Sequence, residues 1–289
     1  MNFQFMKFRK MAYAIAAALV VLSVVSFFTR GMNYGIDFSG GLSMEVAPIS
    51  ADFGIEQMRS ELSEFLPELQ EFRETGTISV RVPMTQGATD AEHNEMTRAV
   101  RDILRDRVEF LEVRTVGPQI GGELIRGGIM AVFFAFILMS IYIWIRYRGG
   151  YAMSAFATLC LDFVLMFGFF SLVGLEFNQT AIAVILMAIG YSTNDKVVNY
   201  DRIEENSKKY HKMPIAQVID LSVNEMLKRT IITSTTTALC MLGLFLFGGM
   251  MLRDFSIAMM FGILLGSMTS IFISNALLLN FNMRESDKA

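Results

Sequence analysis

Asp195 is an acidic residue in a stretch that is otherwise typical of a membrane helix. An apolar run begins at Ala181, and a helix starting there would reach Asp195 about 20 Å further on, at about 1.5 Å per residue. That depth is still inside a hydrocarbon core of roughly 30 Å. An acid there costs about 2.5 kcal/mol or more, which is typical of a site for ions, protons or an ion pair. Asn194 precedes the acid, and the helix becomes polar only at Asp201.

Two further polar groups interrupt apolar stretches. Asp162 lies in the middle of one run, and Arg229 opens another. Several hydroxyl residues follow Arg229: Thr230, Thr233, Ser234, Thr235, Thr236 and Thr237. Arg229, Thr233 and Thr237 are spaced i, i+4 and i+8, which places them on one face of a helix. We hypothesise that Arg229 pairs with Asp195 beside a path of hydroxyls and water, and that a proton on Asp195 releases the cation.

Each of these groups also has a purely structural interpretation. Arg229 can anchor its helix at the membrane surface, and the Ser/Thr run can join helices by hydrogen bonds. Asp162 can be the partner of a neighbouring helix. The structural interpretation is least suited to Asp195, because a carboxylate at that depth is costly to retain without a role.

The composition indicates a membrane protein and argues against several other classes. The chain has 289 residues, of which 53% are hydrophobic and 18% charged, whereas a soluble domain has about 25% charged residues. The net charge of −3 argues against nucleic-acid binding. Cys160 and Cys240 lie in apolar runs without a CxxC pattern, so we interpret them as small buried apolar residues and expect no metal site. HExxH, GxSxG and P-loop patterns are absent from the sequence, so we expect neither an enzyme nor a cofactor.

Six apolar runs are long enough to span a membrane. They cover Met11–Phe28, Leu124–Ile145, Ala152–Gly174, Ala181–Tyr200, Thr230–Phe247 and Phe255–Leu279. The first run follows Lys7, Arg9 and Lys10 but has no cleavage site, so we interpret it as a retained helix in the lipid bilayer. Lysine and arginine are concentrated in the short segments assigned to the inner side, which predicts that both termini are cytoplasmic. Six glycines in or beside these runs predict close helix contacts: Gly168, Gly174, Gly190, Gly243, Gly262 and Gly266.

The stretch between the first two apolar runs is polar and has the periodicity of a soluble domain. Leu42–Ala47, Thr77–Val82 and Glu109–Val116 alternate as strands. Ile55–Leu66 and Ala91–Val108 have helical spacing. This β-α-β-α-β order predicts a small α+β domain of the ferredoxin-like kind on the outer face, without an active-site pattern.

These observations divide the chain into four parts. Residues 1–30 form the cytoplasmic N-terminus and the first membrane helix, residues 31–122 form a periplasmic domain, residues 123–283 form membrane helices two to six with a cytoplasmic loop at about 201–228, and residues 284–289 form a cytoplasmic tail.

Three motifs resemble those of the SecD/SecF protein-export family. Gly35-Ile36-Asp37-Phe38-Ser39-Gly40-Gly41 is similar to the family signature G-[IL]-D-F-[ST]-G-G. Gly190-Tyr191-Ser192-Thr193-Asn194-Asp195, followed by Asp201-Arg202-Ile203-Glu204-Glu205-Asn206, resembles the fourth-helix motif of the SecF branch. Arg229-Thr230 with Thr233-Ser234-Thr235-Thr236-Thr237 resembles its fifth-helix motif. The Asn-Asp pair, the chain length and the single small domain favour SecF over SecD.

The resemblance implies a fold and a role. It implies a multi-pass protein of the resistance-nodulation-division (RND) superfamily in the bacterial inner membrane. Such a protein works as a heterodimer with SecD beside the SecYEG channel and uses the proton-motive force to help unfolded preproteins leave. YajC and YidC are further candidate partners. Protons are the expected coupling ion, with sodium as the alternative.

The resemblance also implies roles for individual residues. Asp195 and Arg229 match the proton-pathway acid and arginine, and Asp162 matches an acid of the third helix. With the neighbours inferred from spacing, the predicted pathway is Asp195, Arg229, Asp162, Asn194, Thr233 and Thr237. The family motif contributes Gly35, Asp37, Gly40 and Gly41, and we interpret Gly40-Gly41 as a hinge between the domain and the first helix, from the wide dihedral range of glycine.

The sequence departs from the family pattern beside the key acid. Lys196 stands where a small residue or threonine is usual, and Val198-Asn199-Tyr200 replaces a Val-Val-Phe stretch. Lys196 could pair with Asp195 or extend to the cytoplasmic surface. We favour the surface, because neighbouring residues on a helix point about 100° apart.

The favoured function is a SecF-like subunit that couples ion flow to preprotein export without covalent chemistry. One alternative is half of an RND-type exporter of small molecules or lipids, which would call for an apolar pocket or larger outer domains. Another is a non-transporting scaffold of the Sec channel, in which the membrane acids could be neutralised without loss of function.

Overall fold

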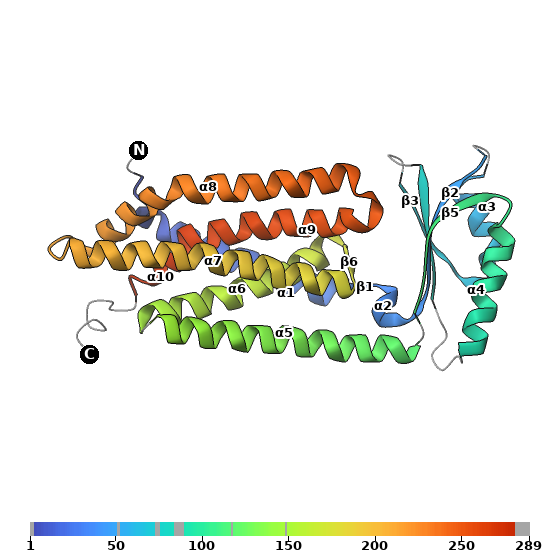
Figure 1. Cartoon of the computed structure of the whole chain (residues 1–289), viewed down its shortest axis with the longest axis horizontal. Coiled ribbons are helices and arrows are strands. Elements are labelled where there is room, and N and C mark those ends of the chain that lie inside the picture. Colours follow the sequence, from blue (N-terminus) through green and yellow to red (C-terminus); the bar gives the residue numbers. More distant parts are fainter. Residues whose placement is uncertain are drawn as a thin grey trace. The chain divides into compact units, whose positions relative to one another are not determined.

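The chain folds into two compact units. The computed structural model describes residues 3–50, 53–72, 76–83, 90–116, 118–147 and 149–280. One unit comprises Met1–Asn33 and Ala131–Ala289 and is called the helical unit; the other comprises Tyr34–Met130 and is called the α+β unit (Figure 1).

Long apolar helices dominate the chain. They are α1 (Arg9–Arg30), α5 (Pro118–Arg146), α6 (Gly150–Val173), α7 (Gln179–Lys209), α8 (Ile215–Phe247) and α9 (Gly249–Met268). The shorter elements are η1 (Phe5–Phe8), the π-helical segment η3 (Thr269–Ser274), α10 (Asn275–Leu277) and the paired two-residue strands β1 (Asn33–Tyr34) and β6 (Glu176–Phe177). Six described helices have the length and composition needed to cross a membrane, which confirms the six predicted spans.

Both α7 and α8 are longer than the predicted spans. Most of the stretch predicted as a loop, at about 201–228, is helical. Apolar side chains explain the extension, because Ile203 of α7 packs in one buried core with Ile219 and Val223 of α8. Arg229 therefore lies well inside α8, and the prediction that it opens the fifth helix is wrong.

The third, fifth and sixth membrane spans pack against α7, which is the fourth. This helix contacts α6, α8, α9 and η3 (Figure 1). Its apolar side chains share a buried core with those of α6 and α9, which includes Met166, Val184, Ile185 and Met259. The polar residues of α7 are consequently held between several helices.

Glycines on α9 allow it to approach α7 closely. A Cβ atom added to Gly262 would lie 2.4 Å from the Cβ atom of Ala188, and one added to Gly266 would lie 2.7 Å from the Cβ atom of Ser192. Neither distance is compatible with a side chain unless the helices separate. The prediction that these glycines mark close helix contacts is confirmed.

The other predicted contact glycines differ from one another. Gly168 of α6 faces α1, where an added Cβ would lie 2.0 Å from Ser23 Oγ. Gly174 ends α6 with a φ of 75°, a conformation that favours glycine. Gly190 and Gly243 have open space beside them, so neither supports the predicted helix contact.

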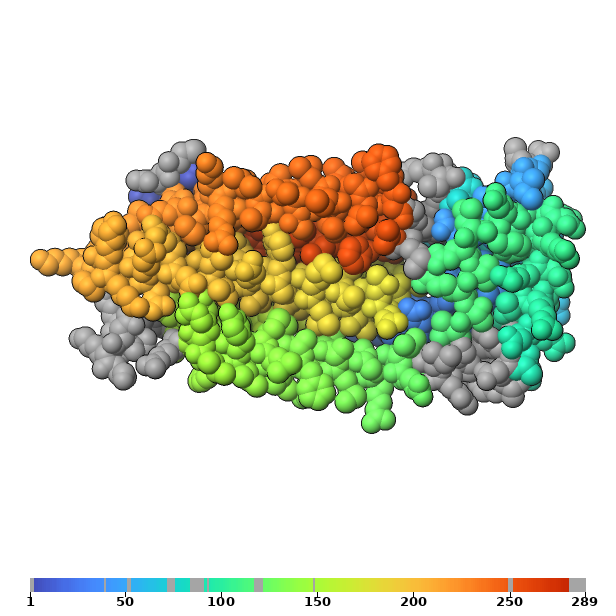
Figure 2. All heavy atoms as spheres, viewed as in Figure 1, coloured from blue at the N-terminus to red at the C-terminus, as the bar shows by residue number. Residues whose placement is uncertain are grey.

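One face of α8 is open at the surface of the helical unit. In Figure 2 the helix forms the orange band along the unit, and Ile231, Leu239 and Leu246 are exposed on it. Cys240 on the same helix is exposed, whereas Cys160 is partly buried. The prediction that both cysteines are buried is therefore wrong for Cys240 within this chain.

The α+β unit contains a four-stranded antiparallel sheet with two helices on one face (Figure 1). Its elements are β2 (Gly41–Pro48), α3 (Ile55–Glu61), η2 (Ser63–Phe65), β3 (Glu68–Phe72), β4 (Thr77–Pro83), α4 (Asp90–Leu104) and β5 (Val108–Val116). Alternate residues of the inner strands, such as Leu42, Met44 and Val80, are buried against Met58 and Leu104 of the helices.

The strand order β3-β4-β2-β5 fits the predicted ferredoxin-like kind of domain and adds one strand. The sequence predicted two helices and three strands, and it missed β3. Three of the five residues of β3 are polar (Glu68, Gln70 and Glu71), and it is an edge strand that pairs only with β4. Such a strand lacks the apolar alternation that reveals a half-buried strand in a sequence.

The last two of the three glycines in the family motif, Gly40 and Gly41, have positive φ angles, which favour glycine. Gly40 has a φ of 73° and Gly41 a φ of 140°. Gly40 closes the short helix α2 (Ile36–Ser39) by donating its N–H to the Ile36 carbonyl at 2.9 Å. Gly41 begins β2 and pairs with both neighbouring strands. Glycine is needed here for a fixed conformation, and the hinge role stays a prediction.

Gly262→Ala should destabilise the helical unit. The new methyl group would lie 2.4 Å from Ala188 Cβ, so α9 must move away from α7, and overpacking of this kind costs about 1–3 kcal/mol. Thermal unfolding of the purified chain in detergent should show a lower midpoint.

Gly243→Ala is the matched control, because open space surrounds that glycine. It should leave the midpoint unchanged or raise it slightly, since alanine favours a helix over glycine by about 1 kcal/mol. Equal midpoints for the two variants would contradict the close approach of α9 to α7.

Candidate functional site in the membrane helices

Asp195 is partly buried on α7 and faces α8. The hydroxyl of Thr230 donates a hydrogen bond to Asp195 Oδ1 at 2.9 Å, and the Ser270 hydroxyl of η3 also lies beside the carboxylate. Thr230 is itself buried. The carboxylate is therefore held at the junction of α7, α8 and η3 by hydroxyl groups.

The other predicted pathway residues on α7 and α8 lie near this junction, but no hydrogen bond or ion pair among the described residues joins their side chains to Asp195. Arg229 is exposed, and although its charge acts on Asp195, no ion pair joins the two side chains in the described part of the chain. The Thr233 and Thr237 hydroxyls donate to carbonyls of their own helix, at 3.0 and 2.9 Å. Asn194 is exposed beside Asp195. The hydroxyl that reaches Asp195 is that of Thr230, which belongs to the same Ser/Thr run.

Asp162 and Lys196 form a buried ion pair between α6 and α7. Both side chains are 2% exposed, and Lys196 Nζ donates to Asp162 Oδ2. Ser192 completes the group: its hydroxyl donates to the same carboxylate oxygen at 2.6 Å and accepts from Lys196 Nζ at 2.7 Å. The prediction that Lys196 extends to the surface is wrong, and so is its alternative, a pair with Asp195.

The rotation of α7 explains these contacts. Ser192 and Lys196 are spaced i and i+4, so they share the face that meets α6. Asp195, about 100° away, is directed toward α8 instead. The i, i+4 spacing shows in the sequence that Ser192 and Lys196 share a face of the helix, but it does not show that this face meets Asp162.

Hydrogen bonds continue along α7 beyond the ion pair. Asn199 donates to the Ser270 hydroxyl at 2.8 Å. Tyr200 is fully buried and contacts the hydroxyls of Ser154, at 3.2 Å, and of Ser274. Both Ser270 and Ser274 belong to η3, and π-helical segments occur frequently at functional sites. The serines of the last span were not singled out from the sequence.

At the Lys209 end of α7, the polar contacts reach the surface. Arg146 forms an ion pair with Asp201 at 2.6 Å, and the Tyr147 hydroxyl donates to the same carboxylate at 2.9 Å. Burial, together with the hydrogen bond to Asp201, raises the pKa of Tyr147, so its hydroxyl keeps its proton.

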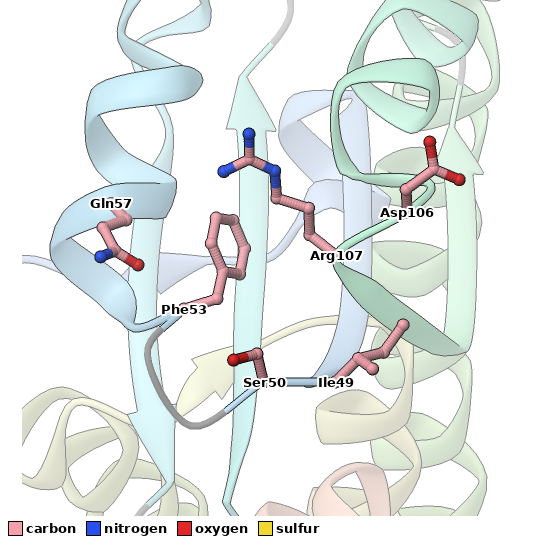
Figure 3. Close-up of a pocket in the computed structure, with 6 residues that line it drawn as sticks. All are labelled: Ile49, Ser50, Phe53, Gln57, Asp106 and Arg107. Carbon is pink, nitrogen blue, oxygen red and sulfur yellow. The ribbon is translucent and has the colours of Figure 1, made fainter.

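Among the described residues of the α+β unit, a small hollow of about 310 Å³ is lined by Ile49, Ser50, Phe53, Gln57, Asp106 and Arg107. Figure 3 shows Phe53 and Arg107 facing each other in it, while the Asp106 carboxylate points away. The Arg107 guanidinium lies 5.4 Å from the centre of the Phe53 ring and pairs with Glu61 at 2.5 Å. These contacts hold α3 to the start of β5, and they bring no acid–base pair into the hollow.

The first residues of the family motif, Gly35 to Asp37, lie at the start of the α+β unit. Gly35 precedes α2 in an extended conformation, and Asp37 lies in the first turn of that helix. The roles of Gly35 and Asp37 stay predictions.

The fold and this site define a class of protein. The chain is a multi-pass helical membrane protein that carries a small α+β domain and buries an acid and an ion pair among its spans. These are properties of a multi-pass membrane protein with a polar site among its spans, the class to which membrane transporters belong.

The comparisons with known proteins identify the family. Residues 95–284 match the model for "Protein export membrane protein SecD/SecF, C-terminal", and residues 25–47 match that for the "SecD/SecF GG Motif". The chain is 40% identical to the protein translocase subunit SecF of Rickettsia felis, over 99% of this chain and 94% of the relative. It is 40% identical to that of Rickettsia bellii, over 99% and 96%. The chain belongs to the SecD/SecF family.

Solved structures of SecDF share the fold. SecDF from Thermus thermophilus, a translocon-associated membrane protein, matches with a TM-score of 0.83 and 32% identity over 97% of this chain. A structure of SecDF in a super-membrane-facing form matches with a TM-score of 0.71 and 32% identity over all of it. This chain spans 38% and 40% of those two longer chains.

Removing either partner of the Asp162–Lys196 pair should strongly destabilise the helical unit. Asp162→Asn and Lys196→Met each leave one buried charge without its counter-charge, which costs about 3–5 kcal/mol. The double variant removes both charges, so its free energy of unfolding should fall by much less than the sum of the decreases in the two single variants. Unfolding of the purified chain in detergent would measure this coupling.

Glu204→Gln serves as the control for a surface pair. Glu204 accepts from Lys208 one turn away at 2.6 Å on the outside of α7, and such pairs contribute about 0–1 kcal/mol. Additive effects of the Asp162 and Lys196 variants would show that the two charges do not stabilise each other.

Proposed function

We propose that the chain is a SecF-like subunit of the protein translocase, and that it uses the proton-motive force through Asp195 to promote export of preproteins. The observation that carries the proposal is the Asp195 carboxylate, set in a membrane helix and bound by the Thr230 hydroxyl of the next helix. The likeness to SecF subunits over nearly the whole chain supports the translocase role.

The location of Asp195 suits a group that takes up and releases a proton. A charged carboxylate at this depth is costly, whereas the protonated form is not, so proton uptake changes the energy of the α7–α8 contact. Thr230 donates a hydrogen bond to the carboxylate, and its hydroxyl can turn to accept a hydrogen bond from the O–H of the protonated acid instead. Asp162 is held by Lys196 and Ser192, which leaves Asp195 as the acid available for exchange.

The available energy matches the task. One charge that moves across 100 mV releases about 2.3 kcal/mol. That energy shifts a two-state equilibrium by roughly fiftyfold. A bias of this size is enough to favour outward movement of a sliding polypeptide over its return.

The orientation follows from the charges near the spans. Lysine and arginine lie near the N-terminus, after α5 and around the α7–α8 turn, and such residues are retained on the cytoplasmic side. We infer from this charge pattern that both termini lie in the cytoplasm and the α+β unit on the periplasmic side of a bacterial inner membrane.

A second membrane subunit would complete the site. Arg229, Thr233 and Thr236 are exposed on α8, and Asn194 is exposed on α7. Exposed polar groups at membrane depth call for a protein partner or water rather than lipid. Because the SecDF neighbours are chains more than twice as long as this one, we assign SecD as that partner. The SecYEG channel, with YajC and YidC, and an unfolded preprotein complete the proposed assembly.

Asp195→Asn tests the proposal directly. The variant, in complex with the organism's own SecD, should lose the part of preprotein release from membrane vesicles that depends on a proton gradient, because asparagine cannot exchange a proton. Release without a gradient should be unchanged, and the complex should still assemble.

Glu204→Gln, which removes a partly exposed acid of the same helix that pairs with Lys208, should release preprotein as the unaltered complex does. Gradient-dependent release that survives Asp195→Asn would reject the coupling role and favour a scaffold of the Sec channel.

A further inference from the structure

Lys196 is a cation fixed inside the membrane unit. Its side chain is 2% exposed, and it is among the largest side chains that are fully buried in the described residues. An isolated ammonium group is very costly in such a place, so its position must be set by the oxygens around it. Those oxygens are Asp162 Oδ2 and Ser192 Oγ.

The atoms that hold Lys196 Nζ are the kind that hold a small metal cation. A carboxylate oxygen and a hydroxyl oxygen are hard ligands, which suit hard cations as well as an ammonium group. Asp162 Oδ1 is buried and has no hydrogen-bond partner among the described side chains, so one more oxygen of the same acid lies at this position. The lysine nitrogen thus lies among oxygens of the kind that also bind small cations.

The tether gives the lysine an advantage over any free ion. Lys196 is one helical turn from Ser192, so its ammonium group reaches the serine and Asp162 without a further change of the backbone. A group on a short tether acts at an effective concentration of millimolar or more at its site. It also donates directed hydrogen bonds to both oxygens, which a spherical ion cannot do.

We propose that Lys196 is a tethered cation that occupies the Asp162 site and excludes sodium from it. Only its consequence for ion coupling rests on the proposed function, in which Asp195 is the acid that exchanges the coupling ion. It assigns to Asp162 a constant counter-charge, supplied by the chain itself.

The charged groups around the two acids are consistent with separate tasks. Lys196 balances Asp162, and the fully buried Tyr200 lies close enough to that acid to be affected by its charge. Asp195 has the Thr230 hydroxyl and the more distant charge of Arg229. If Lys196 were removed, Asp162 would need a cation or a proton from outside.

Thermal unfolding of the purified full-length chain in detergent tests the inference without any transport assay. Midpoints are compared at pH 8 in sodium chloride and in choline chloride of equal concentration, because sodium and protons would compete for a vacated carboxylate. The unaltered chain should unfold at the same temperature in both salts. Lys196→Ala should unfold earlier than the unaltered chain in choline, and sodium should raise its midpoint by about 2–4 °C.

Three further variants define the site. Lys196→Ser leaves space and adds a hydroxyl, so it should show the same sodium effect as Lys196→Ala. The double variant Asp162→Asn with Lys196→Ala should lose the effect. Lys208→Ala removes an exposed lysine of the same helix, so its unfolding midpoint should be the same in sodium chloride and in choline chloride.

Results that would overturn the Lys196 inference differ from those that would reject the coupling role of Asp195. A sodium-specific rise in the unaltered chain would show that the site is open despite Lys196. Folded Lys196→Ala and Lys196→Ser variants without a sodium effect, or failure of both to fold in sodium, would show that no cation can replace the ammonium group. Survival of gradient-driven release in Asp195→Asn would reject the coupling role alone and leave the assignment of Lys196 intact.

Discussion

A charge inside a membrane requires a partner, and α7 carries two opposite charges at adjacent positions. Lys196 meets Asp162 on α6, whereas Asp195 meets Thr230 on α8. Because consecutive residues on a helix point about 100° apart, a single helix satisfies both neighbours. The position of α7 between α6 and α8 therefore depends on charges as much as on apolar packing.

The close packing of α9 supports this arrangement. Gly266 lies against Ser192, the serine that contacts both members of the ion pair. A larger residue at that point would press on the buried polar group as well as on the helix contact. The π-helical segment after α9 then brings Ser270 and Ser274 to Asn199 and Tyr200. Small residues and hydroxyl groups thus allow a row of hydrogen-bonded polar side chains to be buried along α7 within an otherwise apolar unit.

Much of the fold could be predicted from the sequence, because long apolar runs and alternating strands are local signals. The first half of α8 was missed since its apolar residues are spaced to face α7 outside the predicted span, as with Ile219 and Val223. The site was predicted in part. Asp195 and Asp162 stand out by depth alone, but the pairing of Lys196 depends on how α6 and α7 are rotated against each other, and spacing within one helix carries no such information.

The length of α7 has a mechanical consequence. At about 1.5 Å per residue, Lys209 lies roughly 21 Å beyond Asp195 along the helix axis. Asn206 and Arg202 bind Ser222 and Glu225 of α8 in this stretch, so the two helix ends form a stiff double arm. A tilt of about 10° at Asp195 would swing the tip of a rigid helical arm of that length by nearly 4 Å. A small rearrangement at the acid would thus become a large displacement at the turn between the helices, as with a lever.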